Sequence, residues 1–349
     1  MCMSSDQIST KDKIKQALLE EAKKTAPHIM AEALFNKLFN HHTISDPMST
    51  FSNDDFPLLR ADKVLFKSGQ NQLTGYFYHY QKPDKSKVVI FVHGFGNGHH
   101  RYFDLIDYLA KNGLYVFSYD ATSFDESEGN GIRGFPQGLI DLSNAINYVK
   151  SLGYKEEDIS LVGHSWGAYS SGAITIDYPH IAKVVMISGF NKSLDLIKSH
   201  GSAWARSKFD DSYGYIVSYE KRHFPQYSSY TVLNAFKNSQ SEYLIIHSED
   251  DKTVPIEAGL ALFKEELKGN HRVSFITLKD RGHGTSYDSA KGRAYYEDLT
   301  NRYKEYLKDK EYTRDEREHL FNLLNDKSRW TDMLNYPLMD SIVDFIKRY

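Results

Sequence analysis

The chain is 349 residues long, enough to bury one large core or two modest ones. Its 43 Lys and Arg nearly balance its 46 Asp and Glu, which gives no indication of a nucleic-acid partner or of binding to an anionic membrane surface. The single cysteine, Cys2, excludes an internal disulfide, and no apolar run approaches the ~20 residues that span a bilayer. The amino-terminal sequence lacks the apolar core of a signal peptide, so we expect a cytoplasmic protein, monomeric or homodimeric.

Along the chain, apolar runs of strand length alternate with longer segments of helical spacing. Residues 11–42 predict one or two amphipathic helices, and two strands are predicted to follow at 63–68 and 73–80. Further strands are predicted at 87–93, 114–120, 159–163, 182–188, 243–248 and 272–278. Helices are predicted near 100–112 and 136–152, from Trp166 onward, and near 256–268. Alternating strands and helices predict a mostly parallel sheet with helices covering both faces.

Two segments do not fit this alternation. Residues 190–240 predict an irregular insertion rich in aromatic side chains, either a lid that forms an acyl pocket or a helical cap with its own small core. Residues 290–349 predict charged amphipathic helices that cover the sheet. The predicted organisation is an amino-terminal helical extension (1–60), a core (61–189 and 241–310), a cap (190–240) and a carboxyl-terminal helical extension (311–349).

The sequence GHSWG at 163–167 predicts a sharp turn that presents a serine. A strand is predicted to end at Val162 and a helix to begin just past Ser165, with Gly163 and Gly167 on either side of the serine. A strand–turn–helix this tight leaves room for little more than glycine beside a strained nucleophile. The helix amino terminus would also direct free N–H groups to the same place.

A serine hydroxyl needs a base to remove its proton and a carboxylate to orient that base. His283 lies between two glycines in KDRGHGT (279–285), directly after the last predicted strand, and is the candidate base. The candidate acids are three consecutive residues after the strand at 243–248, namely Glu249, Asp250 and Asp251. The chain order serine, acid, histidine is that of the nucleophile-elbow hydrolases.

Five motifs within about residues 60–310 resemble those of the α/β-hydrolases, in particular the esterase, lipase and serine-aminopeptidase-like members. They are HGFG (93–96), DATSFDESEG (120–129), GHSWG (163–167), HSEDDKTVP (247–255) and RGHG (281–284). The resemblance implies the α/β-hydrolase fold with a helical cap insertion. It also implies an oxyanion hole formed by the backbone N–H groups of Phe95 and Trp166. HSEDDKTVP is similar to the family pattern HG-x-x-D-x-x-VP, which selects Asp251 as the acid, with Asp250 as second choice.

One of these motifs departs from the family. DATSFDESEG has Thr122, Ser123 and Asp125 where the similar pattern D-x-R-G-x-G-x-S-x-G has arginine and glycines. The shape of this loop therefore does not follow from the resemblance alone.

The remaining histidines receive other interpretations. We expect His93 to brace the oxyanion loop and His164 to pack beside the nucleophile or line the pocket. The expected substrate pocket comprises His93, Gly94, His164, Trp204 and Tyr215. The pairs His41–His42 and His99–His100 lack the acidic or cysteine neighbours of a metal site, so we expect solvated surface there, and neither metal nor cofactor.

The sequence thus predicts a serine hydrolase that cleaves small-molecule carboxylic esters through Ser165, His283 and Asp251. The same residues would serve an aminopeptidase or a thioesterase. A peptidase would need an acid for the substrate amine, and the candidates are Asp210, Asp211 and Glu220. A ligand-binding protein on a hydrolase fold is a further alternative, but it would be expected to have a broken triad.

Overall fold

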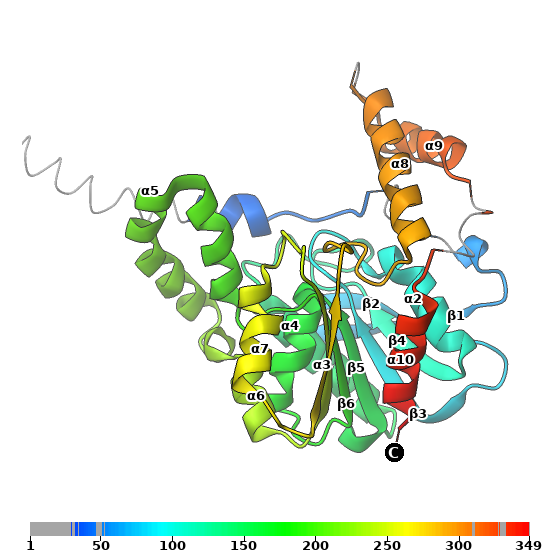
Figure 1. Cartoon of the computed structure of the whole chain (residues 1–349), viewed down its shortest axis with the longest axis horizontal. Coiled ribbons are helices and arrows are strands. Elements are labelled where there is room, and N and C mark those ends of the chain that lie inside the picture. Colours follow the sequence, from blue (N-terminus) through cyan, green and yellow to red (C-terminus); the bar gives the residue numbers. More distant parts are fainter. Residues whose placement is uncertain are drawn as a thin grey trace, which may run out of the picture.

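A single eight-stranded sheet forms the centre of the molecule (Figure 1). The computed structural model describes residues 29, 32–33, 35–46, 51, 53–308, 311–326, 328 and 333–348, without the side chains of 198–212. Across the sheet the strands are β1 (Arg60–Ser68), β2 (Asn71–His79), β4 (Leu114–Tyr119), β3 (Asp84–Val92), β5 (Ile159–His164), β6 (Lys183–Ile187), β7 (Glu242–Ser248) and β8 (Val273–Leu278). β2 pairs antiparallel with β1 and β4, and every pairing from β4 to β8 is parallel. The predicted strands and the mostly parallel sheet are confirmed.

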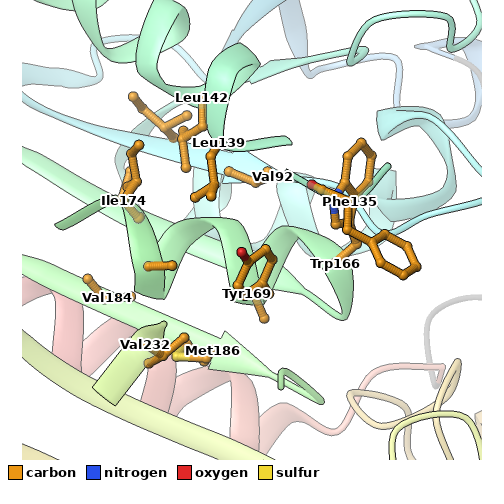
Figure 2. Packing of buried hydrophobic residues seen from close by; sticks show 14 of the residues in the cluster. Val92, Phe135, Leu139, Leu142, Trp166, Tyr169, Ile174, Val184, Met186 and Val232 are labelled. Carbon is orange, nitrogen blue, oxygen red and sulfur yellow. Dashed lines mark hydrogen bonds between the residues drawn. The ribbon is translucent and has the colours of Figure 1, made fainter. Parts of the chain in front are cut away.

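Both faces of the sheet are covered, because the central strands contain apolar runs whose side chains point alternately to the two faces. In β3, Val88 and Ile90 belong to the core on one face, whereas Val89 and Phe91 belong to the core on the other. The first face is covered by α3 (Gln137–Ser151), α4 (Trp166–Ala173), α6 (Val232–Asn238) and α7 (Leu260–Glu266). The second is covered by α2 (Phe103–Lys111) and α10 (Tyr336–Lys347). Figure 2 shows part of the first core, in which α4 lies between the labelled residues of α3 and those of β6 and α6.

The amino-terminal segment takes part in the first core. Phe35 and Phe39 are buried, and the Phe39 ring makes edge-on contacts with Phe95 and Phe135. Residues 11–28 of the predicted amphipathic helices lie outside the described residues. The described part of the extension is therefore packed into the fold next to the loop that follows β3.

Most of the segment 190–240 is helical, in line with the expected helical cap insertion and not with an irregular one. It contains α5 (Ser193–His223), a helix of 31 residues, followed by α6. The carboxyl-terminal part of α5 packs into the first core through buried residues such as Ile216 and Tyr219. Tyr215 is half-buried against the same core, and the side chain of Trp204 lies outside the described residues.

Among the described residues of 290–349 there are three helices, and of these the last covers the sheet whereas the other two do not. α8 (Ala290–Tyr306) and α9 (Arg314–Leu324) pack against each other around a small cluster of their own. That cluster comprises Tyr295, Leu299, Tyr303, Phe321 and Met333. In Figure 1, α5 extends beyond one end of the sheet at the upper left, and the pair α8 and α9 extends beyond the same end at the upper right. None of the described helices is both long and apolar enough to cross a membrane.

Candidate active site

Ser165 lies in a strained turn between β5 and α4. Its backbone has φ 55° and ψ −116°, a conformation that costs energy for any residue with a Cβ. A Cβ on Gly163 would lie 2.3 Å from the Gly167 carbonyl oxygen, and one on Gly167 would lie 2.1 Å from that of Val92. Both flanking positions therefore require glycine. The Ser165 N–H donates to Ile187 O (2.8 Å), which fixes the turn to β6.

The structure brings Ser165, His283 and Asp251 into one line of hydrogen bonds. Ser165 Oγ lies 2.9 Å from His283 Nε2, and His283 Nδ1 lies 2.7 Å from Asp251 Oδ2. An ionised carboxylate only accepts, so Nδ1 carries the imidazole proton and Nε2 accepts the serine hydroxyl. His283 comes from the loop after β8 and Asp251 from the loop after β7, at the carboxyl ends of parallel strands.

Asp251 is held as a carboxylate. Its Oδ1 accepts the backbone N–H groups of Thr253 (2.9 Å) and Val254 (2.8 Å), and His247 Nε2 lies 3.2 Å from its Oδ2. Burial alone would raise the pKa of this carboxyl, but the hydrogen bonds from His247 and His283 outweigh it and hold the pKa well below its usual range.

Asp250 has a different set of partners. Its Oδ1 accepts the N–H groups of Arg281 (3.0 Å) and Gly282 (3.0 Å) and the hydroxyl of Ser248 (2.5 Å). These hydrogen bonds overcome desolvation and lower the pKa of Asp250 to about 2. Asp250 thus anchors the backbone of the His283 loop, while Asp251 contacts the imidazole.

The two proposed oxyanion donors come from different elements, Phe95 from the loop after β3 and Trp166 from α4. Trp166 is the first residue of α4, so its N–H has no partner within the helix. His93 Nδ1 donates to Gly94 O (2.8 Å), the carbonyl of the peptide group whose N–H belongs to Phe95. Ala121 N–H donates to His93 Nε2 (2.9 Å) and thereby fixes the imidazole tautomer. His93 is buried, and because both of its ring nitrogens form hydrogen bonds with backbone groups, it orients the loop after β3.

The departures in DATSFDESEG occur where the backbone turns. Ser123 (φ 67°) and Asp125 (φ 38°) adopt positive φ at positions where the similar pattern has glycine. The Asp125 carboxylate accepts the N–H and the hydroxyl of Ser45, both at 2.6 Å. A contact with the amino-terminal segment therefore holds the strained loop.

His99 is buried, which makes the expectation of solvated surface wrong for this residue. It lies in a short 3₁₀ turn, η3 (His99–Tyr102), which folds it against Asp120 at the end of β4. His99 Nδ1 is 2.7 Å from Asp120 Oδ1, and Nε2 is 2.7 Å from the Tyr78 hydroxyl. His99, His100 and Asp120 offer three ligand atoms within 4.8 Å of one another, but a metal would have to displace one of these two hydrogen bonds. His41 and His42 are exposed, as expected.

His164, directly before the nucleophile, is buried, and one of its two hydrogen-bond partners is Tyr102, a residue in none of the sequence motifs. Tyr102 Oη lies 2.9 Å from its Nδ1, and the His283 carbonyl lies 3.0 Å from its Nε2. Gly94 N–H donates to the same tyrosine hydroxyl (3.1 Å). Nothing in the spacing of Tyr102 signals this contact, because it depends on how η3 packs beneath β5.

The sequence is similar to a hydrolase family model and to two known proteins. A family model described as "Serine aminopeptidase, S33" matches residues 83–208, which include HGFG and the Ser165 turn. Monoglyceride lipase of Rattus norvegicus is 32% identical over 117 residues, covering 32% of this chain and 38% of the lipase. An uncharacterised protein of Acanthamoeba polyphaga mimivirus is 28% identical over 209 residues, covering 57% of this chain and 67% of that protein.

Solved structures show the same architecture. The Pyrococcus furiosus esterase Pf2001 has a TM-score of 0.53 at 20% identity, covering 77% of this chain and 98% of the esterase. The Pyrococcus horikoshii acylaminoacyl peptidase has a TM-score of 0.51 at 18% identity, covering 74% of this chain and 44% of the peptidase. At these identities the likeness establishes a shared fold.

Proposed function

We propose that this chain, which has the α/β-hydrolase fold, is a serine hydrolase that cleaves carboxylic esters through Ser165, His283 and Asp251. The observation that carries this proposal is the continuous line of hydrogen bonds from the Ser165 hydroxyl through His283 to the ionised Asp251. A serine on a strained turn, an imidazole 2.9 Å from its hydroxyl oxygen and a carboxylate behind that imidazole form the minimum set for acyl transfer.

In the proposed reaction, Ser165 Oγ bonds to the ester carbonyl carbon as its proton passes to His283 Nε2. The carbonyl oxygen becomes an oxyanion and accepts hydrogen bonds from Phe95 N–H and Trp166 N–H, each such donor contributing about 10²–10³-fold in typical enzymes. His283 then protonates the leaving alkoxide, which departs as the alcohol. Water gives its proton to His283 and attacks the acyl-enzyme, and the carboxylic acid leaves as Ser165 regains its proton. Throughout, Asp251 balances the imidazolium charge.

The ester preference draws support from the state of Glu220. A peptidase that holds a substrate amine needs an accessible carboxylate, whereas Glu220 is fully buried and its Oε1 accepts the Ser193 hydroxyl. Burial raises the pKa of Glu220 to about 7, although the Ser193 hydrogen bond and Lys192 oppose the shift. The side chains of Asp210 and Asp211 lie outside the described residues. Aminopeptidase activity is the second candidate, because the matching family model carries that description.

The experiment compares p-nitrophenyl esters of increasing acyl length with aminoacyl p-nitroanilides, for wild type and Ser165→Ala. Ser188→Ala is a matched control, since Ser188 is also buried with positive φ (53°) and its hydroxyl has no partner among the described residues. We expect ester turnover in wild type and Ser188→Ala, a loss of at least 10³-fold in Ser165→Ala, and no anilide cleavage. Anilide cleavage faster than ester cleavage would replace the esterase with a peptidase, and full activity in Ser165→Ala would refute both.

A further inference from the structure

Tyr102 and His164 join the backbone of the loop after β3 to the backbone of the His283 loop. His164 Nε2 faces a carbonyl oxygen, which only accepts, so this nitrogen carries the proton and donates to His283 O (3.0 Å). His164 Nδ1 therefore accepts the Tyr102 hydroxyl proton (2.9 Å), and that hydroxyl accepts Gly94 N–H (3.1 Å). The hydrogen bonds run in one direction, from Gly94 through Tyr102 and His164 to His283.

This hydrogen-bond chain is closely packed. Tyr102 and His164 are each 4% exposed, and a Cβ on Gly94 would lie 2.7 Å from the Tyr102 hydroxyl oxygen. Buried hydrogen bonds in a low-dielectric interior are stronger and more costly to break than exposed ones. Burial and the neighbouring His283 lower the pKa of His164 to about 3, so it remains neutral when His283 becomes an imidazolium.

The His283 loop needs such contacts because its own sequence gives it little rigidity. Gly282 has φ 60°, and the space around a Cβ on Gly284 is open to 4 Å. Asp250 binds N–H groups at the start of this loop. Two backbone carbonyls of the His283 loop also have partners. His164 Nε2 donates to His283 O, and Arg101 Nη2 donates to Gly284 O (3.1 Å).

On the basis of the proposed esterase activity, we propose that Tyr102 and His164 are positioning residues that set the separation between the Phe95 N–H and His283 Nε2. Neither side chain donates to or accepts from the reacting atoms themselves. The tetrahedral transition state requires the oxyanion donor and the base at their correct places together, whereas ground-state binding of the ester does not. Removing the connection should therefore lower kcat and leave KM nearly unchanged.

The kinetic test breaks the Tyr102–His164 hydrogen bond from each side. Tyr102→Phe removes one oxygen and keeps the ring, and His164→Gln keeps an amide donor for His283 O but offers no acceptor at the Nδ1 position. We expect each to lower kcat about tenfold, and the double variant to lose no more than the larger single effect. Tyr243→Phe is the matched control, because its buried hydroxyl bonds Thr175 (2.6 Å) and Gly172 O (3.0 Å) in the core of β7 and α4. The proposal would be overturned if the kcat loss of the double variant equalled the product of the two single losses, or if Tyr243→Phe lost as much kcat as Tyr102→Phe.

A second measurement, amide hydrogen exchange, tests the hydrogen-bond chain from Gly94 to His283 without relying on catalysis. In Tyr102→Phe, amide hydrogen exchange should become at least tenfold faster at Gly94 and across 279–285, and should stay at the wild-type rate there in Tyr243→Phe. Wild-type exchange at both places in Tyr102→Phe would refute the connection even if kcat fell. Ester turnover that survived Ser165→Ala would instead refute the proposed function, and the exchange measurement would still decide the connection.

Discussion

Replacement of Asp251 by asparagine tests which of the two adjacent aspartates serves His283. The carboxylate is bound on both sides, with Oδ1 accepting from Thr253 and Val254 N–H and Oδ2 facing His283 Nδ1 at 2.7 Å. In Asp251→Asn the two backbone donors keep the amide oxygen at the Oδ1 position, so the amide nitrogen faces His283. The imidazole must then present a lone pair at Nδ1 and carry its proton on Nε2, where it cannot accept the Ser165 proton.

The expected loss in kcat/KM is about 10³–10⁴-fold, the size seen when a triad carboxylate is neutralised in other serine hydrolases, or about 4–5.5 kcal/mol of transition-state stabilisation. Asp250→Asn is the matched control. Its amide oxygen can still accept from Arg281 and Gly282, and its ion pair with Arg293 is long (3.6 Å) and partly exposed. We expect a loss below about tenfold. Steady-state hydrolysis of a p-nitrophenyl ester, with circular dichroism to verify folding, measures both. A larger loss in Asp250→Asn would refute this assignment.

Three further predictions concern the scaffold. Gly167→Ala should prevent folding, since its Cβ would lie 2.1 Å from Val92 O. Gly214→Ala, where the space around the Cβ is open, should raise the free energy of unfolding by about 0.5–1 kcal/mol. Soluble yield and urea unfolding test both substitutions. Phe39→Ala should cost about 3–5 kcal/mol of unfolding free energy by chemical denaturation, and a cost below 1 kcal/mol would mean that this segment is not docked. Glu220 keeps its proton in the folded protein up to a pKa of about 7, against an ordinary value of 4.5, so stability should fall on the order of 3 kcal/mol as pH rises through that window. Glu220→Gln should abolish this fall in Tm between pH 5 and pH 8, and an unchanged pH profile would contradict the buried carboxyl.

The strands and the serine turn could be predicted because their signals are local. Runs such as VVIFV need helices on both faces, and the flanking glycines of Ser165 follow from space that the structure shows to be filled by backbone. The order of serine, acid and histidine along the chain placed all three candidate residues at the same end of a parallel sheet.

Other features depend on contacts between distant segments. Asp250 and Asp251 are neighbours in sequence, and only the direction of the turn after β7 decides which one faces His283. His99 looks like a surface residue until Asp120, 21 positions later, folds against it. Phe39 is buried because Phe95, in the loop after β3, and Phe135, before α3, are its aromatic partners. The boundaries of the cap and of the two extensions stay a prediction.

The most direct test of the account is to label the protein with a fluorophosphonate and locate the adduct by mass spectrometry. The phosphonyl group bonds to an activated serine oxygen as fluoride leaves, so it reports the nucleophile without any assumption about substrate. We predict one adduct, on Ser165, formed at wild-type rate in Ser188→Ala and lost in Ser165→Ala. Folded wild-type protein that stays unlabelled, or an adduct on another serine, would contradict the proposed serine hydrolase.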